Sequence, residues 1–354
     1  MSLLTDAASR AFAALAGCAA ALCLAPPASA QSGSSVSAQS ASDFFKGKQI
    51  SFFIGYNPGG TYDVYSRIAA AHLSRYIPGQ PVIVAKNMPG VASLKAASYL
   101  YSQAPRDGSA IGMVTQMLAL EQLLKNPAVQ YDAGKFDWLG RLTSAVEVTV
   151  VWHTVPVKTI QDAMSRETLL GATSAGGTTD GMPKLMNKFA GTKFKLVLGY
   201  PGATGTMLAM ERGEVEGAHA TAENLVIGKP DWLRDKTISV LVQYSEQRHR
   251  AFPDVPTMVE LGKTAEDRQI LALFGNSAEI GRALLTPPEV PKDRLAVLRQ
   301  AFDSMASDKT FIAEMANRQM DFEPMSGEAL QRLIKATLDT PPAMAEKARQ
   351  ARDE

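Results

Sequence analysis

The sequence predicts an α/β protein with two similar lobes. Its 354 residues suggest about two domains, at roughly 100–200 residues per domain. Short apolar runs alternate with helical patterns along most of the chain, an order typical of sheets with crossover helices. A glycine-rich stretch stands between a strand pattern and a helix pattern twice, once in each half of the alternation.

The composition is that of a globular protein. Lys and Arg number 36 and Asp and Glu 35, a net charge of +1, which argues against electrostatic binding of nucleic acid. Hydrophobic residues make up 46% and charged residues 20%, which argues against disorder. The two cysteines, Cys18 and Cys23, stand near the start, so the remainder can form neither a disulfide nor a cysteine metal site.

Residues 1–30 read as an export signal. Arg10 precedes an apolar run from Ala11 to Leu24, and an Ala-Ser-Ala ending predicts cleavage after Ala30 and a periplasmic location. A membrane helix is one alternative, although the run is short for about 30 Å of hydrocarbon. The other alternative is a lipoprotein, since Leu-Ala-Gly-Cys resembles a lipobox and would place a lipid on Cys18. Residues 31–46 are expected to form a flexible leader, because their first part is rich in Ser, Gly and Gln.

The first lobe is expected to begin with a β-α-β-α-β unit and parallel strands. Thr61 is the predicted N-cap of its first helix, and Asp63 falls in the first turn, where the helix dipole favours a carboxylate. The expected elements are strands at 49–55, 81–85 and 110–115 and helices at 61–76 and 92–102.

The second lobe has further strand patterns, and the C-terminal part is mainly helical. Pro183 is predicted in the first turn of a helix that ends at Phe189. The apolar stripes around Leu298 and Leu330 are expected to face the core, and residues 346–354 to form a solvated helix end. The remaining expected elements are strands at 147–152, 168–173, 194–200, 215–221 and 238–244 and a helix at 206–212.

Motifs for catalysis, metals and cofactors are missing from the sequence. None of the four histidines has metal-ligand spacing, and neither a P-loop nor a dinucleotide loop follows a strand. The stretch from Gly171 to Gly176 has one residue too many before Ser174 for a nucleophile elbow. No cofactor or metal is therefore expected.

The two glycine-rich stretches are candidate anion sites. Residues 57–61 and 174–179 would each present backbone N–H groups at the start of a helix, where a carboxylate binds favourably. Facing each other across a cleft, they would hold a small organic anion without an arginine. The alternative is that each is only a tight turn.

Ordered motifs over residues 48–335 resemble the tripartite tricarboxylate transporter receptors, also called the Bug family. The family's P-G-G-x-x-D-x-x-x-R pattern matches residues 58–67, and its P-V-x-V-x-N-x-P-G pattern matches residues 81–90. Further matches are A-P-x-D-G at 104–108, two weaker segments at 199–202 and 211–217, and R-x-x-x-x-P-D-V-P-T at 248–257.

The resemblance implies an exported solute-binding receptor, not an enzyme. Its fold would be the two-lobed periplasmic-binding-protein type, a type II Venus flytrap, with lobe 1 at 47–144 plus 269–354 and lobe 2 at 145–268. A cleft between the lobes would close on a small organic carboxylate, and the receptor, a monomer, would deliver it to membrane permease subunits.

Carried over by position, the resemblance implies ligand contacts in both lobes. For Asp63, stabilisation of its own helix is an equal alternative. The implied residues are Tyr56, Asn57, Gly59, Gly60, Thr61, Asp63 and Gln116 in lobe 1, and Ser174, Gly177, Thr178, Thr179, Tyr200 and Thr221 in lobe 2.

The sequence departs from the family at both loops. Residues 87–93 lack one arginine and two glycines of the usual N-R-P-G-A-G-G, and the second glycine-rich stretch also differs. Ligand identity is therefore not carried over. Two other functions stay open: a carboxylate sensor that reports to a membrane signalling protein, and a hydrolase or transferase that uses Ser174 or Asp63.

Overall fold

A computed structural model describes residues 41–173, 177–200 and 202–353. The predicted signal, its cleavage site, Cys18 and most of the predicted leader lie outside the described residues. The end of the leader, however, forms helix α1 (Ala41–Phe45), and Phe44 and Phe45 are buried. Across the described ranges, no helix combines the length and hydropathy needed to cross a bilayer.

The first sheet combines a parallel half with an antiparallel half. Strand β1 (Gln49–Ile54) pairs in parallel with β2 (Val82–Asn87) and β3 (Ala110–Met113), so the predicted β-α-β-α-β unit is confirmed. The antiparallel half was not predicted, because its strands come from two distant parts of the chain. They are β4 (Asp137–Arg141), β10 (Ala283–Thr286) and β11 (Met325–Ser326), in the sheet order β11-β4-β10-β3-β1-β2.

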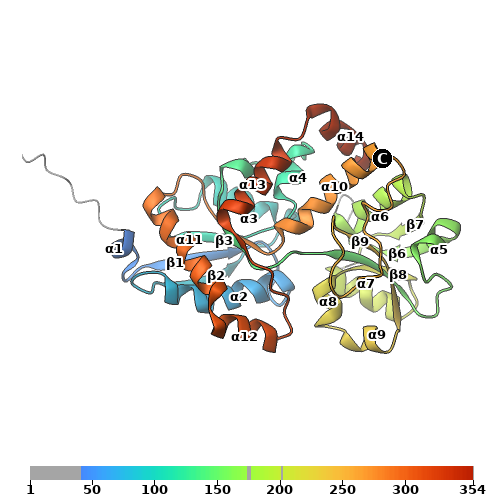
Figure 1. The fold of residues 1–354 in the computed structure, drawn as a ribbon, viewed down its shortest axis with the longest axis horizontal. Helices are drawn as coiled ribbons and strands as arrows, with labels where there is room; N and C mark the ends of the chain where they lie inside the picture. The colour runs from blue at the N-terminus through green and yellow to red at the C-terminus, as the bar shows by residue number, and fades with distance from the viewer. Residues whose placement is uncertain (1–40, 174–176, 201, 354) are drawn as a thin grey trace, which may run out of the picture. The chain divides into compact units, whose positions relative to one another are not determined.

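Helices lie on both faces of this sheet (Figure 1). Their apolar side chains pack in one core cluster on each face. The predicted apolar stripes are core-facing, since Leu298, Phe302, Leu330 and Ile334 are all buried. One face carries α2 (Thr61–Leu73), α11 (Lys292–Ser307) and α12 (Lys309–Asn317), and the other carries α3 (Leu94–Ser102), α4 (Leu118–Leu123) and α13 (Gly327–Leu338). Short 3₁₀ helices occur at Ser74–Tyr76, Val91–Ser93 and Ala133–Lys135.

The second sheet has the order β7-β6-β8-β5-β9, and helices pack on both of its faces. All five of its strands were predicted, with small shifts at the ends. They are β5 (Glu147–Trp152), β6 (Glu167–Gly171), β7 (Lys193–Val197), β8 (Gly217–Thr221) and β9 (Ile238–Tyr244). The helices are α5 (Ile160–Ser165), α6 (Thr178–Phe189), α7 (Gly202–Glu211), α8 (Ala222–Val226), α9 (Pro230–Arg234), α10 (Ala265–Ile280) and α14 (Pro342–Asp353).

Three helix starts differ from the predictions, and one of them is that of α7, which begins at Gly202 and not at Thr206. Helix α2 has Gly60 as its N-cap, so the prediction that Thr61 caps it is wrong. Helix α6 begins at Thr178, and Pro183 therefore lies inside the helix and not in its first turn. Threonine, aspartate and glycine are poor helix formers, so the sequence from Thr178 to Gly181 gives no sign of the helix that it begins.

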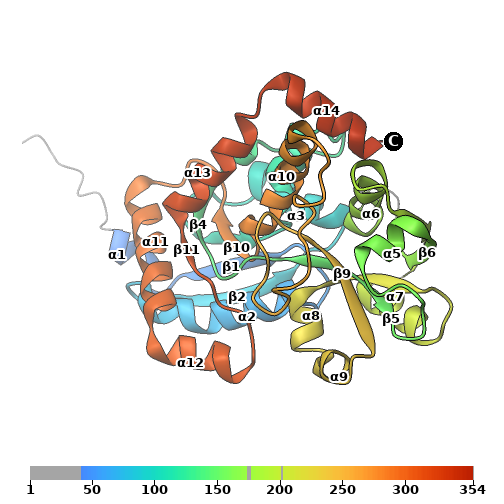
Figure 2. The same ribbon diagram turned by 45° about the vertical axis from the view of Figure 1, so that its right-hand side comes forward.

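The C-terminal helix α14 is packed on one side, contrary to the prediction of a solvated end. Ala348 and Ala351 are buried, and the helix lies against α6 and α10, as Figure 2 shows. These two small residues are three apart, which places them on one face of the helix. Charged residues before and after these alanines dominate the composition of 346–354, so the composition does not reveal the buried face.

Two antiparallel segments link the sheets. Residues 142–146 run from β4 to β5, and residues 281–282 return from α10 to β10. Backbone bonds join them: Arg282 N donates to Thr143 O at 2.9 Å, and Leu142 N donates to Arg282 O at 3.0 Å. The two-lobed α/β fold is thus confirmed, while the lobe boundaries stay predictions.

Candidate ligand-binding site

A cavity of about 1190 Å³ lies between loops of the two sheets. It is lined by the loop before α2, the start of α6, the end of β8 and the segment after β3. The structure therefore brings together most of the residues that the sequence singled out: Tyr56, Asn57, Gly59, Gly60, Thr61, Gln116, Gly177, Thr178 and Thr221.

Three predicted site residues lie outside this lining, and Ser174 lies outside the described residues. Thr179 is buried and holds Thr173, whose backbone N donates to Thr179 Oγ1 at 3.0 Å. Tyr200 packs on the apolar cluster of the second sheet beside Gly171. Thr179 thus supports the lining residue Thr173, while Tyr200 belongs to the packing of the second sheet.

Asp63 is the third predicted site residue that lies outside the cavity lining. Its carboxylate faces its own lobe. It accepts hydrogen bonds from Gly59 N at 2.9 Å, Arg67 Nε at 2.9 Å and Asn87 Nδ2 at 2.8 Å. Burial opposes ionisation of this carboxyl, but the bonds from Arg67, Gly59 and Asn87 outweigh it and lower its pKa. Asp63 thus anchors the loop before α2, and its engaged carboxylate is poorly placed to act on a ligand.

The loop before α2 presents the start of a 13-residue helix to the cavity. Gly59 has φ +85°, a conformation that glycine adopts without strain. Its N–H is already bonded to Asp63, so the amide groups left for an anion are those of Gly60 and the first helical residues. This end of α2 also carries the positive pole of the helix.

Side chains connect this loop to the second lobe and to the linking segments. Thr61 Oγ1 donates to Asn224 Oδ1 at 3.1 Å, and Asn224 N donates to Thr221 Oγ1, the cap of α8. Tyr62 OH donates to Gln116 Oε1 at 3.3 Å, and Gln116 Nε2 donates to Ala145 O at 3.2 Å. The predicted residues Thr61, Gln116 and Thr221 therefore hold the walls together as well as line them.

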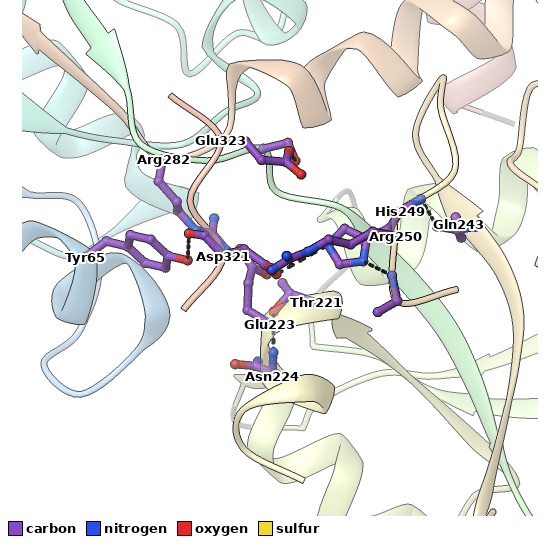
Figure 3. A network of polar contacts seen from close by, with 12 residues as sticks. Tyr65, Thr221, Glu223, Asn224, Gln243, His249, Arg250, Arg282, Asp321 and Glu323 are labelled. Carbon is purple, nitrogen blue, oxygen red and sulfur yellow. Dashed lines mark hydrogen bonds and ion pairs between the residues drawn. The ribbon is translucent and has the colours of Figure 1, made fainter. Parts of the chain in front are cut away.

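Arg282 is a lining residue that the sequence analysis missed. It is only 2% exposed, its guanidinium lies 4.1 Å from the ring centre of Tyr62, and it pairs with Glu223 at 3.2 Å. Figure 3 shows Arg282 and Glu223 reaching toward each other from different segments. One of the linking segments carries this residue into the cavity, so the lining includes a buried arginine that the sequence analysis did not expect.

Two tyrosines stack beside this arginine. The rings of Tyr56 and Tyr62 lie 4.2 Å apart and nearly parallel, with an angle of 21°. Burial is the main cause that raises the pKa of both phenols, and their mutual proximity adds to it for Tyr56. Both phenols are therefore neutral hydrogen-bonding groups at physiological pH.

On the side of the second sheet, Glu147 and His219 face each other across β5 and β8. Glu147 Oε2 lies 2.8 Å from His219 Nε2, and Thr178 Oγ1 donates to Glu147 Oε1 at 3.5 Å. The imidazole stacks on Tyr244, with ring centres 5.0 Å apart. A carboxylate of the chain itself thus lies at the start of α6, where the sequence predicted a site for a ligand anion.

The remaining charged residues of the described lining form ion pairs with one another. Lys229 Nζ lies 2.8 Å from Glu211 Oε1, and Arg352 Nη1 lies 3.3 Å from Glu121 Oε2. Within the described ranges, no group of three or more His, Cys, Asp or Glu side chains is arranged to hold a metal ion.

A second polar network ties the C-terminal part to the loop after β9, outside the cavity lining (Figure 3). Tyr65 OH donates to Asp321 O at 2.8 Å, His249 Nε2 lies 3.3 Å from Asp321 Oδ2, and Arg250 also pairs with this carboxylate. Burial opposes the charge on Asp321, but His249 and Arg250 outweigh it and lower its pKa. This network joins three segments that are distant in the sequence, since Asp321 lies 71 residues after Arg250 and 256 residues after Tyr65.

Comparison with known proteins identifies the family. The sequence model of the tripartite tricarboxylate transporter family receptors matches residues 66–349. The chain belongs to this family. The resemblance read from the sequence motifs is thereby confirmed, and the members of the family are solute-binding receptors.

The individual proteins to which the chain is similar share less than a third of their residues with it. A protein described as "UPF0065 protein in gbd 5'region" from Cupriavidus necator is 29% identical over 238 residues, which is 64% of this chain and 68% of that protein. The solved structure of Rpa4515 from R. palustris with adipate is 21% identical, with a TM-score of 0.64 over 86% of this chain and 97% of that one. The periplasmic binding protein BugD is 18% identical, with a TM-score of 0.64 over 86% and 97%.

Proposed function

We propose that this receptor captures a small organic carboxylate in the cavity between its two sheets. The observation that carries this proposal is the start of α2, whose first amide groups have no intrahelical partner and face the cavity. A helix start of this kind favours an anion. The adipate in the related Rpa4515 structure supports a carboxylate as that anion.

The receptor would work outside the cytoplasm and deliver its ligand to membrane permease subunits, as a monomer and without chemical turnover. The family supports a role in such a transporter, and the periplasmic BugD supports the location. Closure of the two lobes would bring more lining groups onto the ligand. The contacts that already join the lobes, such as Thr61 with Asn224, would tighten in the closed form.

Titration calorimetry tests the proposal. The mature chain is unfolded and refolded to remove co-purified ligand, and is then titrated with a panel of mono-, di- and tricarboxylates. We expect at least one acid to bind with a micromolar or lower Kd, and uncharged amides of the same acids to bind far more weakly. If no acid of the panel binds, or if the amides bind equally well, the proposal is wrong.

A further inference from the structure

Glu147 differs from the other acidic residues of the cavity in what neutralises it. Among the described lining residues, the two other carboxylates pair with side chains that stay charged: Glu211 with Lys229 and Glu121 with Arg352. The partner of Glu147 is a histidine, which is not a permanent cation. Arg282 does not supply the missing charge, because it pairs with Glu223.

Glu147 lines the cavity beside the start of α6. It is the first residue of β5, directly after a segment that links the sheets, and it contacts Thr178 at the start of α6. The negative charge of Glu147 also acts on Tyr62, a lining residue of helix α2. Burial is the main cause of the raised pKa of Tyr62, and the negative charge of Glu147 adds to it.

The carboxylate of Glu147 changes what the second loop can bind. The start of α6 would attract an anion, but a carboxylate of the protein already lies there. A ligand carboxylate at this place would meet a like charge in a partly buried site, which is unfavourable. A group that donates hydrogen bonds, or one with a positive charge, would pair with Glu147.

We propose that the ligand carries one carboxylate and, at its other end, a hydrogen-bond-donating group that pairs with Glu147, best of all an ammonium group. The carboxylate lies at the loop before α2, and the donor lies at the start of α6. This inference rests on the proposed function and deepens it. Apolar side chains that line the cavity, Met182, Leu185 and Met207, suit a methylene chain between the two ends.

Three acids of one chain length make the test. Hexanoate has one carboxylate, 6-aminohexanoate adds an ammonium group, and adipate has a second carboxylate instead. Titration calorimetry at pH 7 compares these three, and a shorter series compares butanoate, 4-aminobutanoate and succinate. We expect the amino acid of a series to bind at least about tenfold more tightly than the diacid, since tenfold is about 1.4 kcal/mol.

The variant Glu147→Gln should reverse this order. It removes the charge and keeps the shape, so the amino acid should lose at least about tenfold in affinity while the diacid gains. Glu167→Gln is the matched control, because Glu167 pairs with Lys195 at an exposed site away from the cavity lining and its loss changes the net charge equally. If Glu147→Gln fails to fold, Glu147→Asp keeps the charge and should keep the preference for the amino acid.

The outcomes separate the two proposals. If the diacid binds as tightly as the amino acid in the unchanged protein, or if Glu147→Gln weakens both equally, the pairing with Glu147 is wrong while carboxylate binding stands. If none of the six acids and no acid of the wider panel binds, both proposals are wrong.

Discussion

The two glycine-rich loops have the same pattern in the sequence, yet the structure gives them different chemistry. In the first, the carboxylate of Asp63 faces its own lobe and leaves the start of α2 open toward the cavity. In the second, the carboxylate of Glu147 comes from a neighbouring strand and faces the cavity itself. A helix start is therefore an anion site only if the protein does not supply the anion.

The largest expected effect concerns Arg282, which supports the first loop through Tyr62 and has no counterpart at the second. Arg282→Met leaves the buried carboxylate of Glu223 without a partner and should destabilise the protein by about 3–5 kcal/mol. Urea unfolding measures this loss. The double variant with Glu223→Leu should recover much of it, and a double variant as unstable as the single one would contradict the pairing.

Gly60→Val tests whether the first loop holds the ligand. Gly60 has φ −80°, and an added Cβ would meet only Asn57 O at 3.8 Å, so the fold should tolerate a side chain. The valine would keep the ligand from the amide groups at the start of α2. Losing two charge-assisted hydrogen bonds should weaken acid binding by about a hundredfold or more. Titration calorimetry checks this loss of affinity, provided that the thermal midpoint of unfolding of the variant is unchanged. Normal binding would exclude the loop as the site.

Asp63→Asn separates support of the loop from ligand contact. The amide keeps the shape but weakens the bonds to Gly59 and Arg67, so the free energy of unfolding should fall by about 2 kcal/mol. Because the side chain does not line the cavity, acid affinity should change less than in Gly60→Val. Urea unfolding and calorimetry on the same samples compare the two. A variant of full stability that no longer binds would mean that Asp63 contacts the ligand.

The pH dependence of stability tests whether the ionised carboxylate of Asp63 stabilises the fold. The pKa of Asp63 is lower in the folded protein than its unfolded value of about 3.9, so its contribution is complete above that value. As pH falls through the folded pKa, this contribution is lost. The stability difference between the unchanged protein and Asp63→Asn should therefore shrink between about pH 5 and pH 2, as urea midpoints would show. A difference that stays constant over this range would contradict the assignment.

Thr178→Val should have the smallest effect. The hydroxyl donates to Glu147 at 3.5 Å, and its replacement by a methyl group of similar size removes one weak hydrogen bond. We expect a loss of about 0.5–1 kcal/mol in acid binding. The matched variant Thr61→Val removes the 3.1 Å bond to Asn224 in the first loop and should cost somewhat more. If the two variants lose equal amounts of binding free energy, the proposed difference between the loops is wrong.

Sequence reasoning found the elements that local pattern encodes. The apolar runs and glycine-rich stretches predicted the parallel unit of the first sheet and the strands of the second, and ordered motifs identified the family, since each depends on residues that are neighbours in the chain. The loop residues from Tyr56 to Thr61 were found for the same reason. The prediction was wrong for the start of α6, because poor helix formers occupy its first turn. It was also wrong for α14, because charged residues surround the two buried alanines.

Only the tertiary structure decided the polarity of the site. Arg282 stands on a linking segment, Glu147 begins β5 and His219 lies on β8, and nothing in their local sequence marks them. The antiparallel linking segments bring Arg282 and Glu147 to one cavity, and the pairing of β5 with β8 places His219 against Glu147. Charge pairing depends on distance in space and burial, which a one-dimensional pattern does not contain.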